Sequence, residues 1–120
     1  MGSKFQDLEV WKFSKEFYLK LNPLLKKFPY HEKNNLVIQL NRSALSISNN
    51  IAEGSGRGSD KSLKYFLQIA FGSAKETENM LIISKELGYL EEKDFNFFTE
   101  ELEKIQKMLF VFMRGFDENR

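Results

Sequence analysis

Two carboxylates, Glu53 and Glu76, are the residues whose type could support chemistry. A pair of carboxylates can act as general acid and general base when their environments separate their pKa values. No accompanying nucleophile or recognisable pocket supports this hypothesis. Each carboxylate instead continues a helical polar stripe, one of Asn49, Asn50 and Glu53, the other of Ser73 and Glu76. We favour a structural hydrogen-bond network between two packed helices, with a solvated surface as the alternative.

Residues 54–59 read Gly-Ser-Gly-Arg-Gly-Ser and could form a phosphate-binding turn. Glycine amides ahead of a helix N-terminus can bind an anion. However, no strand is expected before this segment, no lysine directly follows its last glycine, and the spacing matches neither nucleotide fingerprint. The segment is predicted to be a plain helix-to-helix turn, with incidental contact with nucleic-acid phosphates as the alternative.

The best basic group lies beside this turn. Lys61, Lys64 and Lys75 share one flank of the helix expected after the turn, and Arg57 extends from the turn itself. Repeated around a symmetric oligomer, these charges would form a multivalent surface for phosphates. Arg42, on the preceding helix, is a weaker addition. A solvated helical face is the alternative interpretation.

The overall charge gives little support to nucleic-acid binding, since the formal net charge is only +1. Residues 1–57 hold nine basic and five acidic residues, and residues 58–120 hold nine and twelve. A nucleic-acid binder usually has a stronger basic excess, so such a role would depend on local patches.

No cofactor is expected. His31 is the only histidine, whereas a di-iron bundle needs a Glu-x-x-His pair from each of two helices. Without cysteine the chain can form neither disulfides nor thiolate metal sites. His31 is expected at the start of a helix.

The composition favours one all-α globular domain over residues 1–120. The chain is 42% apolar with twelve Phe, which is ample for a core, and its two Pro and seven Gly leave long uninterrupted segments. No run approaches the roughly 18 apolar residues that would span a bilayer. The N-terminus has no positively charged segment followed by an apolar one. We expect a soluble, cytoplasmic protein without membrane contact.

Apolar periodicity predicts four helices, over residues 7–27, 31–53, 59–87 and 92–115. Short connections imply an up-down-up-down antiparallel four-helix bundle. Phe28-Pro29 should separate the first two helices, and Pro23 should kink the first or loosen its final turns.

The ends of the later helices carry their own signals. Gly54 and Gly88 are expected in the left-handed conformation that closes the second and third helices. Ser59 should cap the third helix at its start.

Each predicted helix has one core stripe. On the first two helices these are Val10, Phe13, Phe17, Leu21, Leu24 and Phe28, then Leu36, Val37, Leu40, Ala44, Ile47 and Ile51. On the last two they are Leu63, Phe66, Leu67, Ala70, Ala74 and Leu81, then Phe95, Phe98, Leu102, Ile105, Leu109, Phe112 and Phe116.

A second apolar set lies outside these stripes. Its members are Trp11, Tyr18, Leu25, Ile38, Leu45, Ala52, Tyr65, Ile69, Gly72, Met80 and Ile83. Leaving six such large side chains exposed would forgo on the order of 10 kcal/mol, at roughly 1.5–3 kcal/mol each. The set therefore predicts a homo-oligomer interface. Wide packing inside one bundle is the alternative.

A set of short motifs carries a family resemblance. They are Phe5, Asp7-Leu8, Val10-Trp11, Phe28-Pro29, Glu32, Gln39-Leu40, Arg42, Ser46-Ile47, Asn50-Ile51-Ala52-Glu53-Gly54, Phe66-Leu67, Ile69-Ala70, Gly72-Ser73, Glu76 and Leu87-Gly88-Tyr89-Leu90. With them the chain resembles the four-helix-bundle family encoded in intervening sequences of bacterial 23S ribosomal RNA genes. That family also includes the accessory variability protein of diversity-generating retroelements.

The resemblance implies a closed homopentamer, no known enzymatic activity and a role in binding RNA or DNA. In retroelement members it also implies a reverse-transcriptase partner. Asn41 departs from the pattern, because a second basic residue is expected there beside Arg42. We therefore expect a non-enzymatic accessory protein that contacts nucleic-acid phosphates, with a protein-interaction scaffold as the alternative.

Overall fold

The computed structural model describes residues 4–118 as four long helices and two 3₁₀ turns, with no strand in that range. The elements in chain order are η1 (Phe5–Asp7), α1 (Glu9–Leu25), η2 (Tyr30–Glu32), α2 (Leu36–Ser55), α3 (Asp60–Glu86) and α4 (Glu92–Glu118). The all-α class and the four helices are confirmed. The expected domain extends to residues 1–3 and 119–120, which lie outside the described residues.

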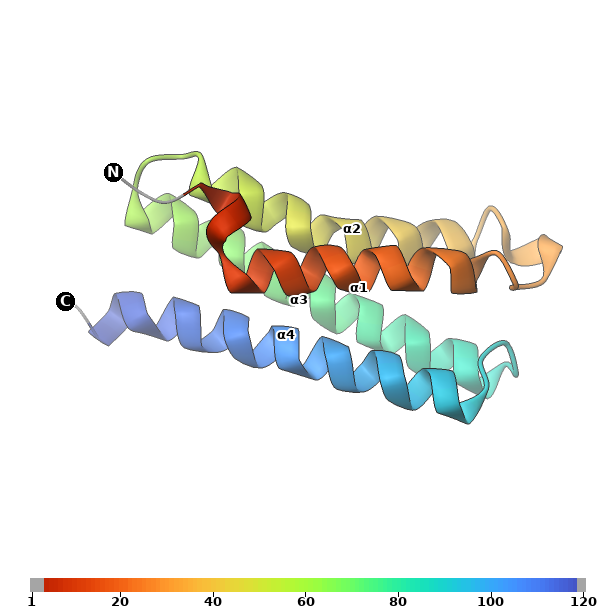
Figure 1. The fold of residues 1–120 in the computed structure, drawn as a ribbon. Helices are drawn as coiled ribbons and strands as arrows, with labels where there is room; N and C mark the ends of the chain where they lie inside the picture. Colours follow the sequence, from red (N-terminus) through yellow and green to blue (C-terminus); the bar gives the residue numbers. More distant parts are fainter. Residues whose placement is uncertain (1–3, 119–120) are drawn as a thin grey trace.

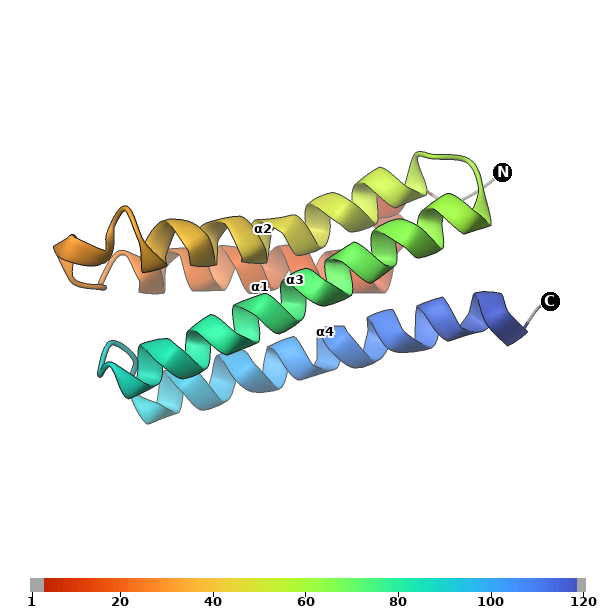
Figure 2. The same cartoon turned by 180° about the vertical axis from the view of Figure 1, so that it is seen from behind.

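The four helices lie side by side in an elongated molecule of 47 × 22 × 19 Å. The α1–α2 and α3–α4 connections lie at one end, and the α2–α3 connection lies at the other, near both chain ends (Figures 1 and 2). Contacts run from α1 to α2, α2 to α3, α3 to α4 and α4 back to α1, most extensively between α2 and α3. Each helix therefore has two neighbours, and the four enclose one core.

The connection between α1 and α2 differs from the prediction. The amide of Lys26 donates to the Pro23 carbonyl at 3.3 Å, so α1 ends at Leu25 in a tight 3₁₀-type turn rather than in the loosened turns predicted to extend to residue 27. Residues 30–32 form a 3₁₀ turn rather than the start of a helix, and α2 begins only at Leu36. Asn35, with φ −127° and ψ −97°, interrupts helical geometry directly before it.

Glycine closes α3 but not α2. Gly88 has φ +84°, its amide donates to the Lys85 carbonyl, and the Tyr89 amide donates to the Ser84 carbonyl, both at 2.9 Å. These two bonds form a Schellman motif, and the prediction for Gly88 is confirmed. At the other connection the left-handed residue is Gly58, with φ +82°. The prediction for Gly54 is wrong, because this residue is helical and buried within α2.

Close packing explains the glycine at position 54. A Cβ there would lie 2.9 Å from Phe66 Cβ and 3.1 Å from Leu63 Cδ1, so a larger residue would push α3 away from α2. Ser59 Oγ accepts a hydrogen bond from the Ser62 amide at 3.1 Å and caps α3 as predicted.

The core follows the predicted stripes on α2, α3 and α4 but is rotated on α1. Phe13 is 40% exposed, whereas Ser14 and Leu25 are buried. Ser14 can be buried because its hydroxyl donates to the Val10 carbonyl at 2.7 Å. The α1 face toward the core therefore runs through Val10, Ser14, Phe17, Leu21 and Leu25.

Candidate nucleic-acid interface

Arg57 lies at the α2–α3 connection, and its charge is already paired. Its Nη2 is 2.7 Å from Glu53 Oε2, and its Nε donates to the same oxygen at 2.8 Å. The guanidinium also lies 4.9 Å from the Phe66 ring centroid. Glu53 therefore holds Arg57 against the protein surface and compensates its charge.

Two of the three lysines in the basic group also face carboxylates. Lys64 pairs with Asp117 of α4, and Lys75 Nζ lies 3.5 Å from Glu78 Oε1. Lys75 is eleven positions beyond Lys64, about 16 Å further along α3. The structure thus gathers Arg57, Lys61 and Lys64 at one end of the molecule and leaves Lys75 apart.

Lys61 and Arg42 differ from these residues. Within residues 4–118 neither has a carboxylate partner, and both are exposed. Lys61 and Lys64 line an open hollow of about 440 Å³ together with Tyr65, whose side chain is 58% exposed. Lys61 is therefore the member of the group most available to an incoming phosphate.

Nearby carboxylates reduce the positive potential at this end. The basic residues Arg57, Lys61 and Lys64 are accompanied by Glu53, Asp60 and Asp117, three charges of each sign. Exposed ion pairs contribute only about 0–1 kcal/mol each, so a phosphate can replace a carboxylate at small cost. One subunit therefore offers little net positive charge at this patch.

The predicted polar residues separate into different places. Ser73 Oγ lies 2.9 Å from Ser46 Oγ, which accepts a hydrogen bond of 2.8 Å from Asn50 Nδ2. In the described part of the chain, Asn49 and Glu76 are exposed and make no side-chain hydrogen bond or ion pair. Glu53 instead forms an ion pair with Arg57, and no contact joins it to Glu76 in the described chain.

The interface between α2 and α3 includes two polar residues, Thr77 and Ser43, that the predicted apolar stripes and polar network did not contain. Thr77 Oγ1 donates to Ser43 Oγ at 2.8 Å and also lies 2.8 Å from the Ser73 carbonyl. Both side chains are buried. In the sequence, this contact could have been found from the small hydroxyl residues that occur on the apolar stripes of α2 and α3. These hydroxyls satisfy one another where the two helices pack closely.

Part of the second apolar set is buried within the single subunit. Leu25 and Met80 belong to the core, while Trp11 and Tyr18 pack against its edge. Ala52 and Ile69 are half-buried, and Gly72 is exposed. Four large members remain open to solvent, namely Ile38, Leu45, Tyr65 and Ile83, at 39–58% exposure. Apolar side chains on both α2 and α3 therefore remain uncovered in the single chain.

A further apolar surface lies between α3 and α4. Phe110 and Val111 are 54% and 59% exposed. They line a hollow of about 390 Å³ together with Phe71 and Gln106. The sequence prediction placed α4 aromatics on the core stripe and did not include this surface.

A buried carboxylate connects the two turns at the opposite end of the molecule. The Tyr89 hydroxyl donates to Glu32 Oε2 at 2.8 Å, and Glu32 Oε1 accepts from Asn35 Nδ2 at 3.1 Å and from the Leu36 amide at 3.4 Å. His31 Nε2 lies 3.2 Å from the Tyr89 hydroxyl. Glu32 thus helps to begin α2 and fixes it to the turn before α4. Its role is structural.

These bonds shift two pKa values. The Tyr89 hydrogen bond lowers the pKa of the Glu32 carboxyl from its ordinary value of 4.5, burial opposes this change, and the bonds from Asn35 and Leu36 lower it further. The same bond raises the pKa of Tyr89 above 10.0. Glu32 is therefore charged and Tyr89 is neutral at pH 7.

The described residues hold neither a metal-binding cluster nor a membrane-spanning helix. No group of three or more His, Cys, Asp or Glu side chains between residues 4 and 118 is placed to hold a metal ion. Over the same range, no helix has the length and apolar character that crossing a membrane requires.

Comparisons with known proteins gave one family and a solved structure. The family model described as 23S rRNA-intervening sequence protein matches residues 6–111. A crystal structure from Bacteroides thetaiotaomicron, described as a protein with unknown function from the S23 ribosomal protein family, has a TM-score of 0.81 and 26% sequence identity. The match covers 88% of this chain and 95% of that chain. No curated protein matches.

Proposed function

The chain belongs to the 23S rRNA-intervening sequence protein family, and from this premise we propose a non-enzymatic accessory protein that binds structured RNA or DNA through backbone phosphates. The bundle has up-down-up-down topology and assembles into a closed homo-oligomer. The resemblance implies a pentamer. The protein has no catalytic residue and reads no base sequence through its phosphate contacts.

The uncovered apolar surface over α2 and α3 supports the assembly. The single chain leaves four large apolar side chains on α2 and α3 at 39–58% exposure, namely Ile38, Leu45, Tyr65 and Ile83. Full burial of a large apolar side chain contributes about 1.5–3 kcal/mol. Completing the burial of these four half-exposed side chains on each subunit contributes a favourable term to association.

The observation that carries the nucleic-acid proposal is the position of Lys61. It is exposed, lacks a carboxylate partner within residues 4–118 and shares a hollow with the exposed ring of Tyr65. Arg57 and Lys64 flank it and can exchange their carboxylates for phosphates. Since one subunit offers little net charge, useful affinity depends on repeating the patch around the oligomer.

The test measures binding of a labelled RNA hairpin and a DNA duplex across a salt series, comparing wild type with Lys61→Glu. The matched control is Lys93→Glu, because Lys93 is also an exposed lysine without a carboxylate partner in the described chain but lies at the start of α4. Loss of one phosphate contact should lower the salt slope by about one for each engaged subunit. Equal affinity and slope in wild type and Lys61→Glu would refute this interface.

A protein-binding scaffold is the second candidate. The hollow of Phe71, Phe110 and Val111 favours it, because this surface is largely apolar and shares no residue with the Lys61 hollow. The partner would be a reverse transcriptase, as in retroelement members, or another protein. Capture of the partner that is insensitive to salt and lost in Val111→Asp would favour this candidate over the first.

A further inference from the structure

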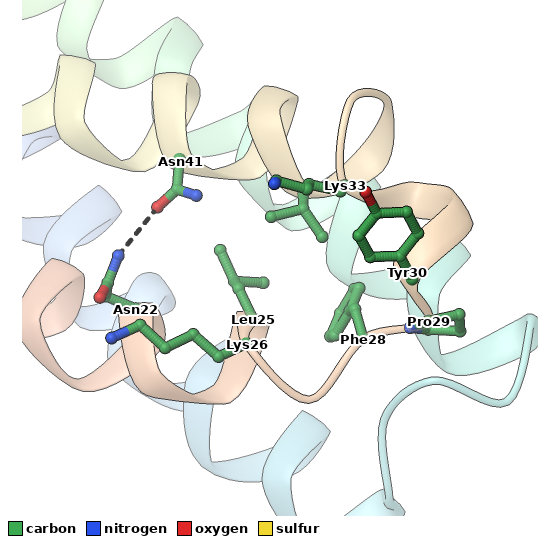
Figure 3. Close-up of a pocket in the computed structure, with 9 residues that line it drawn as sticks. Asn22, Leu25, Lys26, Phe28, Pro29, Tyr30, Lys33 and Asn41 are labelled. Carbon is green, nitrogen blue, oxygen red and sulfur yellow. Dashed lines mark hydrogen bonds between the residues drawn. The ribbon is translucent and has the colours of Figure 1, made fainter.

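A cavity of about 310 Å³ lies between the end of α1 and the start of α2, at the opposite end of the molecule from Lys61 (Figure 3). We propose that it binds one nucleotide, a planar heterocycle carrying a phosphate. The source is an unpaired position of a nucleic-acid strand or a free nucleotide. The inference rests on the proposed function for its ligand class and adds a base-binding pocket to the phosphate contacts.

Positive charge around the cavity is uncompensated. Residues 20–35 contain four lysines and one glutamate. That glutamate, Glu32, is buried and occupied by its bonds to Tyr89, Asn35 and Leu36. In the described chain, Lys26 and Lys33 have no carboxylate within ion-pair distance, unlike Arg57, Lys64 and Lys75.

The two lysines lie on opposite walls of the cavity. Figure 3 shows Lys26 extending along the α1 wall toward Asn22, and Lys33 on the α2 side near Tyr30. An anion bound at this opening therefore meets ammonium groups from both walls. The structure places no such unpaired pair of lysines around the Lys61 hollow, where Asp117 is part of the lining.

An exposed aromatic ring stands at the same opening. Tyr30 is 84% exposed, more than any other large apolar or aromatic side chain of the described residues. Its backbone is held in η2, since its carbonyl accepts the Lys33 amide at 3.0 Å, and the Lys33 ammonium lies 5.6 Å from its ring centroid. An exposed ring on a held backbone, beside a cation, is an arrangement on which unpaired bases stack.

The cavity also holds an amide pair that can contact a base edge. Asn22 Nδ2 donates to Asn41 Oδ1 at 3.2 Å. The pair leaves the Asn41 amide nitrogen as a donor and the Asn22 carbonyl oxygen as an acceptor. Asn41 stands where a second basic residue was expected beside Arg42. With an amide in place of a cation, this position is better suited to hydrogen bonds with the edge of a heterocycle than to contact with a second phosphate.

The volume of the cavity limits the ligand to a single nucleotide. Small-molecule pockets span about 300–1,000 Å³, and this cavity lies at the lower limit. Leu25, Phe28 and Val37 supply apolar lining, and the polar lining comes from both helices, with Asn22 on α1 and Asn41 on α2. One planar ring system fits, with its phosphate at the lysines.

The test uses a poly(A) 12-mer, the same strand with abasic sites, a DNA duplex, and free AMP. Tyr30→Leu removes the stacking ring, K26Q/K33Q removes the two charges, and Lys61→Gln is the control at the other surface. We expect Tyr30→Leu to weaken binding of the 12-mer roughly tenfold, the size expected for one stacked base, with duplex binding unchanged. Lys61→Gln should weaken duplex binding and leave binding of the 12-mer unchanged.

Side-chain amide NMR signals of Asn22 and Asn41 locate the ligand independently of affinity. A shift of these signals by AMP alone, but not by inorganic phosphate, supports a pocket for free nucleotides even when no strand binds and the proposed function fails. A shift by the 12-mer alone identifies an unpaired strand as the source. Equal binding of the abasic and intact strands excludes an unpaired strand as the source of the base. If neither AMP nor the 12-mer shifts these signals, the proposed pocket is refuted. The same holds if the signals stay unshifted because a second subunit covers the cavity.

Discussion

The Tyr89 hydroxyl donates a 2.8 Å hydrogen bond to Glu32 Oε2, although the two residues are 57 positions apart. The bond joins the turn before α4 to the turn before α2. It is supported by the Phe28 ring, whose centroid lies 5.5 Å from that of Tyr89. The end of the molecule that carries the proposed nucleotide pocket is therefore held rigid by one buried carboxylate.

Acid should weaken the fold through Glu32. Its pKa is lower in the folded state than in the unfolded chain, chiefly because of the Tyr89 hydrogen bond. The stability that it contributes is therefore complete above its unfolded pKa, near 4.5, and is lost as pH falls through the folded value. We expect denaturant midpoints measured from pH 7 to pH 3 to fall less steeply in Tyr89→Phe than in wild type. Parallel curves would contradict this assignment.

Gly54 should tolerate no side chain. Gly54→Ala places a Cβ 2.9 Å from Phe66 Cβ, and such overpacking costs about 1–3 kcal/mol in free energy of unfolding. The matched control is Gly115→Ala in α4, where no atom lies within 4 Å of the added carbon. That variant should be neutral or more stable by up to about 1 kcal/mol. Urea unfolding of both variants checks the pair, and equal stabilities would show that the α2–α3 approach is not limiting.

The buried hydroxyls of Thr77 and Ser43 should be energetically coupled. Thr77→Val removes the donor of a 2.8 Å bond and should destabilise the fold by about 1 kcal/mol or more, because Ser43 loses a buried partner. Ser43→Ala should have a similar effect, and the double variant should cost less than the sum of the two. A double-mutant cycle measured by chemical denaturation gives the coupling. Strict additivity would mean that each hydroxyl is satisfied by its own helix.

Leu45 should be needed for assembly. Leu45→Glu places a charge in the apolar surface that the single chain leaves open, and light scattering should then give the 14.1 kDa monomer instead of a larger species. Leu19→Glu is the control, since Leu19 is 54% exposed on α1 and lies outside this surface. An unchanged mass for Leu45→Glu would place the interface elsewhere, with the Phe110 and Val111 surface as the next position to change.

Local signals in the sequence were sufficient for the four helices, the Ser59 cap and the Gly88 closure, because each depends on residues a few positions apart. They were not sufficient for the rotation of the α1 core face from Phe13 to Ser14. An apolar stripe shows that a helix is covered but not on which flank its neighbours lie. The same limit explains why Leu25 and Met80 were assigned to an interface although they lie in the core.

The candidate site shows the limit more strongly. The sequence identified Arg57, Lys61 and Lys64 as basic neighbours, but it could not show that Asp117, 53 positions after Lys64, pairs with it. The Asn22–Asn41 pair likewise depends on how α1 and α2 pack. Charge compensation across helices is a property of the folded chain, and it decides which lysines remain available.

The contact at Gly54 also links the residue at this position to the spacing of α2 and α3 during divergence. A side chain could enter position 54 only if the backbone of α3 moved away, since the nearest atom is Phe66 Cβ at 2.9 Å, which every residue except glycine carries. Replacing Gly54 alone therefore destabilises the fold, whereas the exposed lysines can be substituted one at a time. Residues of the binding surfaces can thus diverge in sequence while the spacing between α2 and α3 is preserved.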